Sequence, residues 1–345
     1  MEPEDLVMSS VVVFGAYGHT GQFVVAELQG RGFTPVVSGR DEGRLRALGF
    51  DARPATVDDP AALDRALAGA AAVINCAGPF AVTARPVAAA AVRAGIPYVD
   101  VAAEIEANAD TFAAFDGRTD TTIVPAMAFF GGLGDLLATA AMGDWTAADE
   151  AHVAYGLSGW HPTNGTRVAG AVSRERRDGR RVRYSGGCLE YHDDAPRTLT
   201  WPFPTPREVV AEFSMADVVT IPSHLAIPSV CSYLTVDAVR DLAAPDTPAP
   251  SGRTAQTFVV DVVVRRGDAE RRATATGRDI YATSAPLAVE AVERILSGRT
   301  RAVGVASAGA IFDPVDFLRA LTGVTVEIDG YDPSRTYVRK ELTRG

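Results

Sequence analysis

The stretch VVVFGAYGHTGQFVVAEL, residues 11–28, decides the fold class of this chain. Its first four residues form a short, continuous apolar run rich in β-branched side chains, which is typical of a buried parallel strand. From residue 22 to residue 28 the apolar side chains mark one face of a helix, which Gly30 and Gly32 then end. A strand, a glycine-rich turn and a helix in this order predict the first unit of an α/β domain.

The turn between this strand and this helix carries three glycines at successive spacings of three. The first glycine permits the tight turn, the second lets a pyrophosphate approach the backbone, and the third lets the helix pack closely on the strand. The helix N-terminus adds free N–H donors and the positive end of its dipole. A purely structural glycine turn is the alternative, which the flanking strand and helix disfavour. We therefore predict a dinucleotide site formed by Gly15, Ala16, Tyr17, Gly18, His19, Thr20 and Gly21.

The chain alternates between strands and helices up to about residue 124 and then changes character. Further strands are expected over 34–37, 52–57, 72–76, 97–101 and 122–124. Such βα repeats imply a parallel, doubly wound Rossmann sheet with right-handed crossovers. Beyond about residue 145 strands predominate, including a predicted hairpin formed by 257–264 and 270–276. We expect an α/β fold with a Rossmann domain over 8–127, an α+β substrate and dimerisation domain with an antiparallel or mixed sheet over 128–305, and a C-terminal segment, 306–345, that returns to the first domain.

The end of the second predicted strand indicates which dinucleotide is bound. An NAD site usually has a carboxylate there, which accepts hydrogen bonds from the adenosine ribose. This chain has Ser38, Gly39 and Arg40 instead, and a hydroxyl with a guanidinium suits the 2′-phosphate of NADP. Asp41 follows directly and keeps NAD open as an alternative, while Arg40 is alternatively a solvated surface residue.

Two further segments follow the third and fourth strands. Asp58 or Asp59 lies where Rossmann domains meet the adenine edge, although Asp59 is at least as well placed to cap the helix that starts at Pro60. Cys76, Ala77, Gly78 and Pro79 follow the fourth strand, where the nicotinamide half of the cofactor is expected.

Composition excludes several classes of function. The formal net charge is −10 and the pI about 5.1, so we expect neither nucleic acid nor a membrane surface as a partner. The three cysteines show no CxxC pair, no HExxH or Cys/His cluster predicts a metal, and no apolar run reaches membrane-spanning length. The N-terminus, residues 1–6, is acidic and does not resemble a signal peptide. We therefore expect a cytoplasmic protein without a metal.

Several motifs together resemble the saccharopine dehydrogenase-like family, including its trans-acting enoyl reductase branch. They are GxxGxTG at 15–21, SGR at 38–40, NCAGPF at 75–80, YVDVAAE at 98–104, PAMAFFGGLGDLLA at 125–138, NGT at 164–166 and GRDIY at 277–281. The resemblance implies an N-terminal Rossmann domain, an inserted substrate domain, a C-terminal return, reduction by NAD(P)H and a homodimer. Ala103 and Leu133 depart from the family's usual glycine and proline near the expected substrate, so the resemblance does not transfer a substrate.

Reduction needs a group that orients the substrate and protonates it. Tyr98, Asp100 and Glu104 follow the predicted fifth strand, with core packing and helix capping as their alternative roles. His161 lies in a glycine- and proline-bounded loop near Thr166, although a surface role is the more common one for such a histidine. We predict Tyr98, Glu104 and His161 as catalytic candidates and Asp100, Phe129 and Thr166 as substrate contacts.

These observations favour an NADPH-dependent oxidoreductase that transfers a hydride to a small C=N, C=C or C=O substrate in specialised metabolism. A sensor or scaffold that binds NADP without turnover is the main alternative, because no obvious catalytic dyad stands out. A flavin enzyme with a similar glycine turn is a third.

Overall fold

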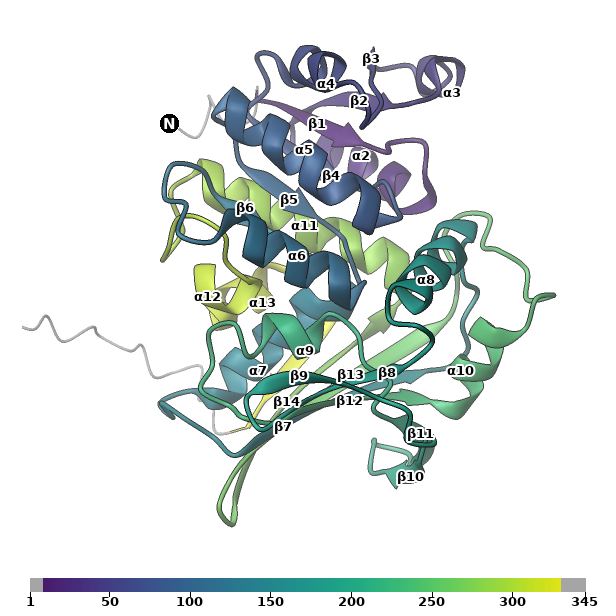
Figure 1. The fold of residues 1–345 in the computed structure, drawn as a ribbon, viewed down its shortest axis with the longest axis vertical. Coiled ribbons are helices and arrows are strands. Elements are labelled where there is room, and N and C mark those ends of the chain that lie inside the picture. The colour runs from purple at the N-terminus through teal and green to yellow at the C-terminus, as the bar shows by residue number, and fades with distance from the viewer. Residues whose placement is uncertain (1–8, 330–345) are drawn as a thin grey trace, which may run out of the picture.

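The computed structural model describes residues 9–329, which form two domains, each built on its own sheet (Figure 1). The expected domain start at residue 8, the acidic N-terminal residues and residues 330–345 of the expected C-terminal return lie outside the described residues. The first sheet has the order β3-β2-β1-β4-β5-β6, and all its strands are parallel. They are β1 (Ser10–Phe14), β2 (Thr34–Gly39), β3 (Asp51–Pro54), β4 (Ala72–Asn75), β5 (Tyr98–Asp100) and β6 (Ile123–Val124).

Helices cover both faces of the first sheet, so the predicted doubly wound Rossmann fold is confirmed. The connecting helices are α2 (His19–Gly30), α3 (Glu42–Arg46), α4 (Pro60–Leu67), α5 (Phe80–Ala94) and α6 (Ile105–Phe115). Side chains of β1 alternate between two separate cores, as the pleat of a strand requires. Val11 and Val13 belong to one core together with α2, whereas Val12 and Phe14 belong to a second with α4 and α5. An apolar run without alternation is therefore what a strand buried on both faces needs.

The second sheet is mixed, as the sequence predicted. Its order is β10-β11-β12-β7-β13-β14-β15, and β8 and β9 form a hairpin beside β12. Only β12 and β7 run parallel, while the other pairs are antiparallel. The strands are β7 (Glu150–Leu157), β8 (Arg181–Ser185), β9 (Cys188–His192), β10 (Thr198–Trp201), β11 (Arg207–Ala211), β12 (Val230–Thr235), β13 (Thr257–Arg266), β14 (Ala269–Arg278) and β15 (Val324–Ile328).

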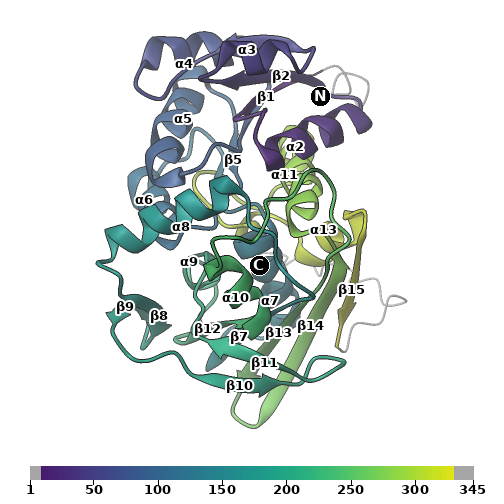
Figure 2. The same cartoon turned by 90° about the vertical axis from the view of Figure 1, so that its right-hand side faces the viewer.

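One face of the second sheet packs toward the first domain (Figure 2). Alternate residues of β13, from Phe258 to Val264, join the same core as α7 and α11. The helical segments of this half are the irregular turn η1 (Phe129–Leu133), α7 (Gly134–Met142), α8 (Asn164–Arg176), α9 (Asp217–Thr220), α10 (Val236–Ala243), α11 (Ile280–Leu296), α12 (Ala308–Ile311) and α13 (Pro314–Ala320). A single core therefore continues from the Rossmann sheet into the second domain.

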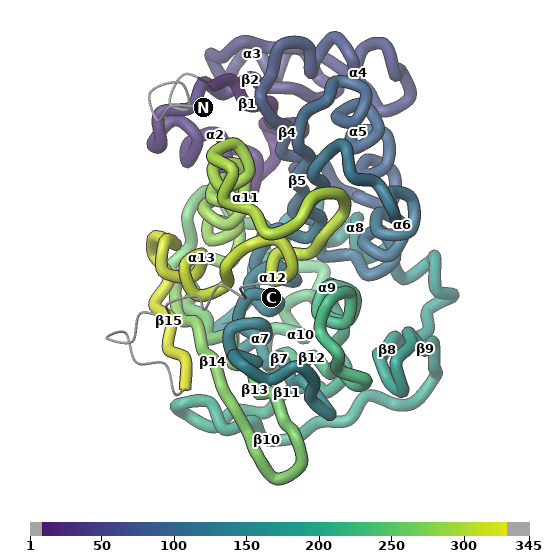
Figure 3. The backbone as a smooth tube through the Cα atoms, turned by 90° about the vertical axis from the view of Figure 1, so that its left-hand side faces the viewer, coloured from purple at the N-terminus to yellow at the C-terminus, as the bar shows by residue number. Residues whose placement is uncertain are grey.

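The chain returns to the first domain earlier than the sequence suggested. Helix α11 packs along α2, and residue 123 of β6 hydrogen-bonds residues 304 and 306. Beyond that point α13 packs on α7 and β15 pairs with β14, so residues 306–329 belong mainly to the second domain (Figure 3). The expectation of a return starting at residue 306 is corrected, because the amphipathic helix that makes it is α11.

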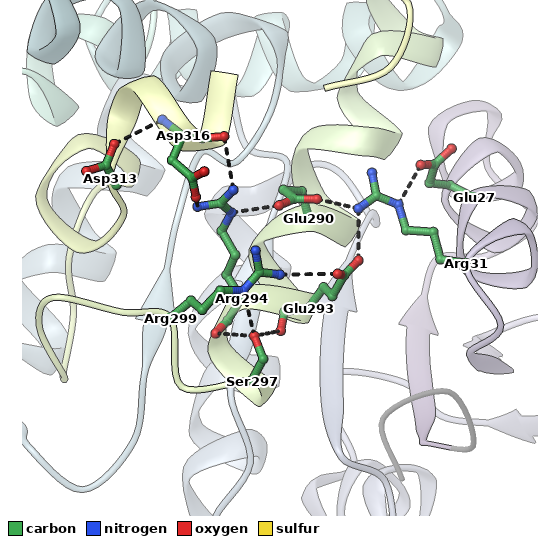
Figure 4. A network of polar contacts seen from close by, with 9 residues as sticks. All are labelled: Glu27, Arg31, Glu290, Glu293, Arg294, Ser297, Arg299, Asp313 and Asp316. Atoms are coloured by element: carbon green, nitrogen blue, oxygen red, sulfur yellow. Dashed lines mark hydrogen bonds and ion pairs between the residues drawn. The ribbon is translucent and has the colours of Figure 1, made fainter. Parts of the chain in front are cut away.

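A chain of alternating charges links α2, α11 and α13 (Figure 4). Arg31 donates to Glu27, Glu290 and Glu293, and Glu290 also accepts from Arg294 at 2.6 Å. Arg294 continues the chain to Asp316 at 2.7 Å. Because Glu290 and Arg294 are 3% and 2% exposed, this network lies inside the joint between the domains.

Candidate functional site

A cleft of about 1650 Å³ opens where the two domains meet. The Rossmann side contributes the carboxyl ends of β1, β2 and β4, and the second domain contributes η1, α8 and the start of α11. Helix α8 spans the boundary between the domains in Figure 2. Ligands of open α/β sheets bind outside the carboxyl ends of their strands, so the cleft lies where the fold predicts a site.

The glycine turn forms one end of the cleft, and its geometry requires glycine. Gly15 has φ +85°, and a Cβ on it would lie 2.8 Å from the Cβ of Ala77. A Cβ on Gly21 would lie 2.4 Å from the carbonyl oxygen of Gly15, where the helix passes the turn. In the described chain no side chain caps α2, so its first N–H groups stay available to an anion. The wall here comprises Gly15, Tyr17, Gly18, His19 and Thr20, while Ala16 and Gly21 are buried behind it and support the turn.

Next to the turn, two arginines line the cleft without an ion-pair partner among residues 9–329. Arg40 follows β2, and the guanidinium of Arg44 in α3 lies 4.3 Å from the centre of the Tyr17 ring. Sequence reasoning missed Arg44, although its place four residues after Arg40, on a short helix capped by Asp41, was a usable signal. The Asp41 carboxylate accepts from the backbone N–H of Arg44 and is thereby engaged as the cap.

Two of the predicted cofactor contacts are corrected by the structure. Ser38 is fully buried and its hydroxyl donates to the carbonyl of Arg53 at 2.7 Å, so it holds β3 instead of facing the cleft. Asp59 caps α4 by accepting from the N–H of Ala62, and the cleft wall is formed by residues 55–58. Gly39 lines the cleft as expected. In both cases the polar side chain forms a hydrogen bond with a nearby backbone group instead of facing the cleft.

The loop after β4 lies on the other side of the glycine turn, and Cys76, Ala77, Gly78 and Pro79 all line the cleft. The buried Asn75 side chain accepts from the N–H of Ala77 at 3.0 Å and fixes the start of the loop. At its end, the carboxyl of Glu104 accepts from the N–H of Phe80, the first residue of α5. The loop is thus held at both ends by side chains beneath the cleft.

Tyr98 and Asp100 lie under this loop and do not reach the cleft, which corrects their expected roles. Both are fully buried, and the phenol of Tyr98 donates to Asp100 at 2.8 Å. The second oxygen of Asp100 accepts from the N–H groups of Ala102 and Ala126. Burial raises the pKa of Asp100 to about 6. This pair anchors Ala126, which has φ +56°, where the chain leaves the Rossmann domain.

Glu104 is the one predicted catalytic candidate that lines the cleft. Its side chain is 8% exposed, and its oxygens accept from Phe80 and Ala103. Burial raises the pKa of the Glu104 carboxyl, and the backbone hydrogen bonds oppose that change. His161, in contrast, is not among the residues that line the cleft, because its loop turns the adjacent Trp160 inward instead.

The second-domain end of the cleft is aromatic and carries hydroxyl groups. Phe129 and Phe130 of η1 line it together with Trp160 and Tyr281. Thr166 lies at the start of α8, and its hydroxyl is 2.9 Å from that of Tyr281. Phe129 and Thr166 were predicted from the sequence. Tyr281 was absent from the predicted site, since an aromatic residue at a helix start is usually core.

Comparisons with known proteins agree with this geometry. Residues 11–122 match the family described as the saccharopine dehydrogenase NADP binding domain. A probable mitochondrial saccharopine dehydrogenase-like oxidoreductase of Arabidopsis thaliana is 32% identical over 132 residues, a match that covers 32% of this chain and 29% of that protein. Residues 11–122 therefore match the NADP-binding domain of the saccharopine dehydrogenase family, and the chain spans less than a third of the length of this curated relative.

The fold of this chain also has a counterpart over most of its length. The apo structure of the L-Glu-forming saccharopine dehydrogenase of Saccharomyces cerevisiae covers 93% of this chain and 99% of its own, with a TM-score of 0.62 at 12% identity. The fold class is therefore confirmed, and the match over residues 11–122 agrees with the predicted resemblance and with an NADP-type Rossmann domain.

Two further findings concern membranes and metal ions. Among residues 9–329 no helix is long and apolar enough to cross a membrane. Within the same residues, no group of three or more His, Cys, Asp or Glu side chains is arranged to hold a metal ion.

Proposed function

We propose that this protein is an NADPH-dependent oxidoreductase that transfers a hydride to a small C=N, C=C or C=O substrate in specialised metabolism. The observation that carries the proposal is the continuity of one cleft from the glycine turn to the aromatic end under α8. Its volume of about 1650 Å³ exceeds the roughly 300–1,000 Å³ of a pocket for one small ligand, so it has room for a dinucleotide and a substrate.

The residues at the Rossmann end fit a dinucleotide. The turn at Gly15 packs closely on the loop at Ala77 only because no Cβ is present, and the uncapped start of α2 offers N–H donors to a phosphate. When bound, the dihydronicotinamide supplies the hydride. Residues 76–79 would hold that ring at the carboxyl end of β4, while the aromatic rings of η1 exclude water from the reacting atoms.

The charges near β2 favour NADPH over NADH. Arg40 and Arg44 both line the cleft, and neither has a carboxylate partner in the described chain. The nearest candidate acceptor for an NAD ribose, Asp41, already caps α3. Two guanidinium groups can hold a 2′-phosphate by charge-assisted hydrogen bonds, which NADH cannot form.

Fluorescence titration with NADPH and NADH tests this assignment. The loss of one charge-assisted bond predicts that Arg40→Ala and Arg44→Ala each weaken NADPH binding by about 10- to 100-fold. NADH binding should not change. The matched control is Arg46→Ala, because Arg46 pairs with Glu42 on the exposed side of α3 and does not line the cleft. Wild-type protein that binds neither dinucleotide would refute the proposed function.

Turnover is tested separately with the holoprotein and a panel of a cyclic imine, an α,β-unsaturated thioester and a ketone. Oxidation of NADPH with at least one of these compounds supports the reductase, and the compound that reacts fastest identifies the bond that is reduced. Tight NADPH binding without any turnover would instead favour the sensor or scaffold. The expected homodimer and cytoplasmic location stay predictions, which light scattering and cell fractionation would check.

A further inference from the structure

Three hydroxyl side chains, two from the start of α8 and one from the start of α11, form a cluster at the aromatic end of the cleft. The indole N–H of Trp160 donates to the Tyr281 hydroxyl at 3.0 Å, and the backbone N–H of Thr163 donates to it at 3.1 Å. The Thr166 hydroxyl lies 2.9 Å from the same oxygen and 2.9 Å from the hydroxyl of Thr163. All four residues line the cleft.

Counting donors and acceptors fixes the direction of the hydrogen bond between Tyr281 and Thr166. The phenol oxygen of Tyr281 already accepts two N–H groups, so its own hydrogen can go only to Thr166. In the bond between Thr163 and Thr166 either hydroxyl can donate. When Thr163 donates, the hydroxyl hydrogen of Thr166 has no acceptor in the cluster and is available to a ligand, because Thr166 is half-buried at the cleft wall.

We propose that Thr166 is the proton donor of the reduction and that Tyr281, acting through Thr166, replaces the transferred proton from behind. This inference rests on the proposed function and assigns the group that completes it. In the reaction, the carbon of the C=N, C=O or C=C bond gains the hydride and the π-electron pair moves to the other atom. That atom takes the proton of Thr166 as its O–H bond breaks. The proton of Tyr281 moves to Thr166, and water in the cleft returns a proton to Tyr281 after product release.

The surroundings of Tyr281 suit a phenol that gives up its proton briefly. Two N–H donors stabilise the phenolate oxygen, as an oxyanion hole does. Tyr281 is also the second residue of α11, where the positive end of the helix dipole favours a negative charge. Burial raises the pKa of the Tyr281 phenol and its hydrogen bonds oppose that change, so the resting group is protonated.

Tyr281 also contacts the dinucleotide end of the cleft. The rings of Tyr281 and His19 meet edge to face with centres 5.2 Å apart, and His19 belongs to the glycine turn. Burial lowers the pKa of His19, so a neutral imidazole lies against the phenol. The hydroxyl cluster is thus held beside the turn that binds the dinucleotide, on a wall shared by both parts of the cleft.

Glu104 is the competing proton donor, and its contacts argue against that role. Its two oxygens accept N–H groups of Phe80 and Ala103, an arrangement that a carboxylate satisfies better than a carboxylic acid. Glu104 therefore acts as a positioning residue for the loop at 76–79. The variant Glu104→Gln separates the two assignments.

The kinetic test compares Thr166→Val, Thr166→Ser and Tyr281→Phe with the wild-type holoprotein, using the fastest substrate of the panel. Loss of a general acid predicts that Thr166→Val slows single-turnover hydride transfer by about 10²- to 10⁴-fold. NADPH binding should stay at its wild-type value, and Thr166→Ser should restore most of the rate. Tyr281→Phe should lower kcat without raising KM. The matched control is Tyr191→Phe, because Tyr191 is a half-exposed residue of β9 that does not line the cleft.

A second readout needs neither cofactor nor turnover. In apo protein labelled at the tyrosine Cζ carbon, the Tyr281 resonance is identified by its loss in Tyr281→Phe. Thr166→Val should shift this resonance, since the phenol loses the acceptor of its hydrogen, and the other tyrosine resonances should stay in place.

The outcomes separate the two proposals. A wild-type protein that turns over while Thr166→Val keeps the full rate overturns the relay and leaves the reductase intact. Turnover that is slow in Glu104→Gln but unchanged in Thr166→Val overturns the relay, and wild-type NADPH binding by Glu104→Gln would then assign the donor role to Glu104. If wild-type protein reduces nothing, the proposed function fails, and an unshifted Tyr281 resonance in Thr166→Val then also removes the hydrogen-bonded relay.

Discussion

At the scale of single residues, the glycines of the first turn and helix differ in what they permit. Gly15 and Gly21 lie where a Cβ would overlap another part of the turn, whereas a Cβ on Gly30 would meet nothing within 4 Å. Gly15 also has a positive φ, which most other residues adopt only with strain. All three glycines look alike in the sequence, but only two of them are needed for the site.

Substitution of Gly21 by alanine should therefore destroy dinucleotide binding. A Cβ 2.4 Å from the Gly15 oxygen must push α2 away from the turn, and the N–H donors move with it. We expect no measurable NADPH binding by Gly21→Ala in fluorescence titration. Gly30→Ala in the same helix is the control, and it should bind normally and gain up to about 1 kcal/mol of stability. Equal binding by both variants would contradict this account of the turn.

At the scale of elements, the turn η1 depends on a buried acid behind it. Asp217, at the start of α9, is fully buried, accepts from the Tyr155 phenol at 2.8 Å and receives a backbone hydrogen bond from Gly131 of η1. Its second oxygen has no partner among the described residues. Burial raises the pKa of Asp217 to about 7. The acid therefore holds the segment that presents Phe129 and Phe130 to the cleft.

The raised pKa of Asp217 predicts that the free energy of unfolding falls as the pH rises. Between the pKa of an unfolded aspartate, about 4, and the folded value, the native state binds more protons than the unfolded state, so ionisation of Asp217 favours unfolding. The contribution of Asp217 is complete below pH ~4 and lost by pH ~7, at about 1.4 kcal/mol per pKa unit.

Urea denaturation of wild type and Asp217→Asn across this pH range measures the effect. The stability difference between the two proteins should move in favour of the variant as the pH rises, because the amide cannot ionise. Asp246→Asn changes an exposed loop carboxyl and should track the wild type. Parallel curves for wild type and Asp217→Asn would mean that the carboxyl is not held in its neutral form.

Packing also decides where elements begin. A proline favours the first turn of a helix, but α5 begins at Phe80 and carries Pro86 inside it. Phe80 and Ala84 are buried against Ala102 and Ala107 of the next βα unit, and this contact outweighs the cost of an internal proline. Helix α8 was not predicted from the sequence. Only Ser173 among its residues is buried, so its apolar pattern is weak.

At the scale of the whole molecule, the network around Glu290 and Arg294 joins α2, α11 and α13 (Figure 4). Both groups are buried, so each charge depends on its partners for the solvation that it has lost. The helix whose N-terminus forms the phosphate turn is thereby fixed to the second domain.

Removal of the Arg294 guanidinium should destabilise the fold strongly. Arg294→Met leaves a buried Glu290 with one partner fewer, and breaking a buried pair costs about 3–5 kcal/mol of unfolding free energy in urea denaturation. Arg299→Met removes a half-exposed arginine that pairs with Glu293, and it should change stability by less than about 1 kcal/mol. Comparable losses in both variants would show that burial of the network does not matter.

The sequence by itself determined the Rossmann domain, its glycine turn, an antiparallel or mixed second sheet and about half of the cleft wall on the Rossmann side. These features depend on local patterns: apolar runs, glycine spacing and the order of strands and helices. Only the tertiary structure decided which polar side chains reach the cleft. Ser38, Tyr98 and Asp100 face buried backbone or each other, while Arg44 and Tyr281 face the cleft. The physical reason is that most buried polar groups need a partner, and partners such as Arg53 for Ser38, Ala126 for Asp100 and Trp160 for Tyr281 come from other segments of the chain.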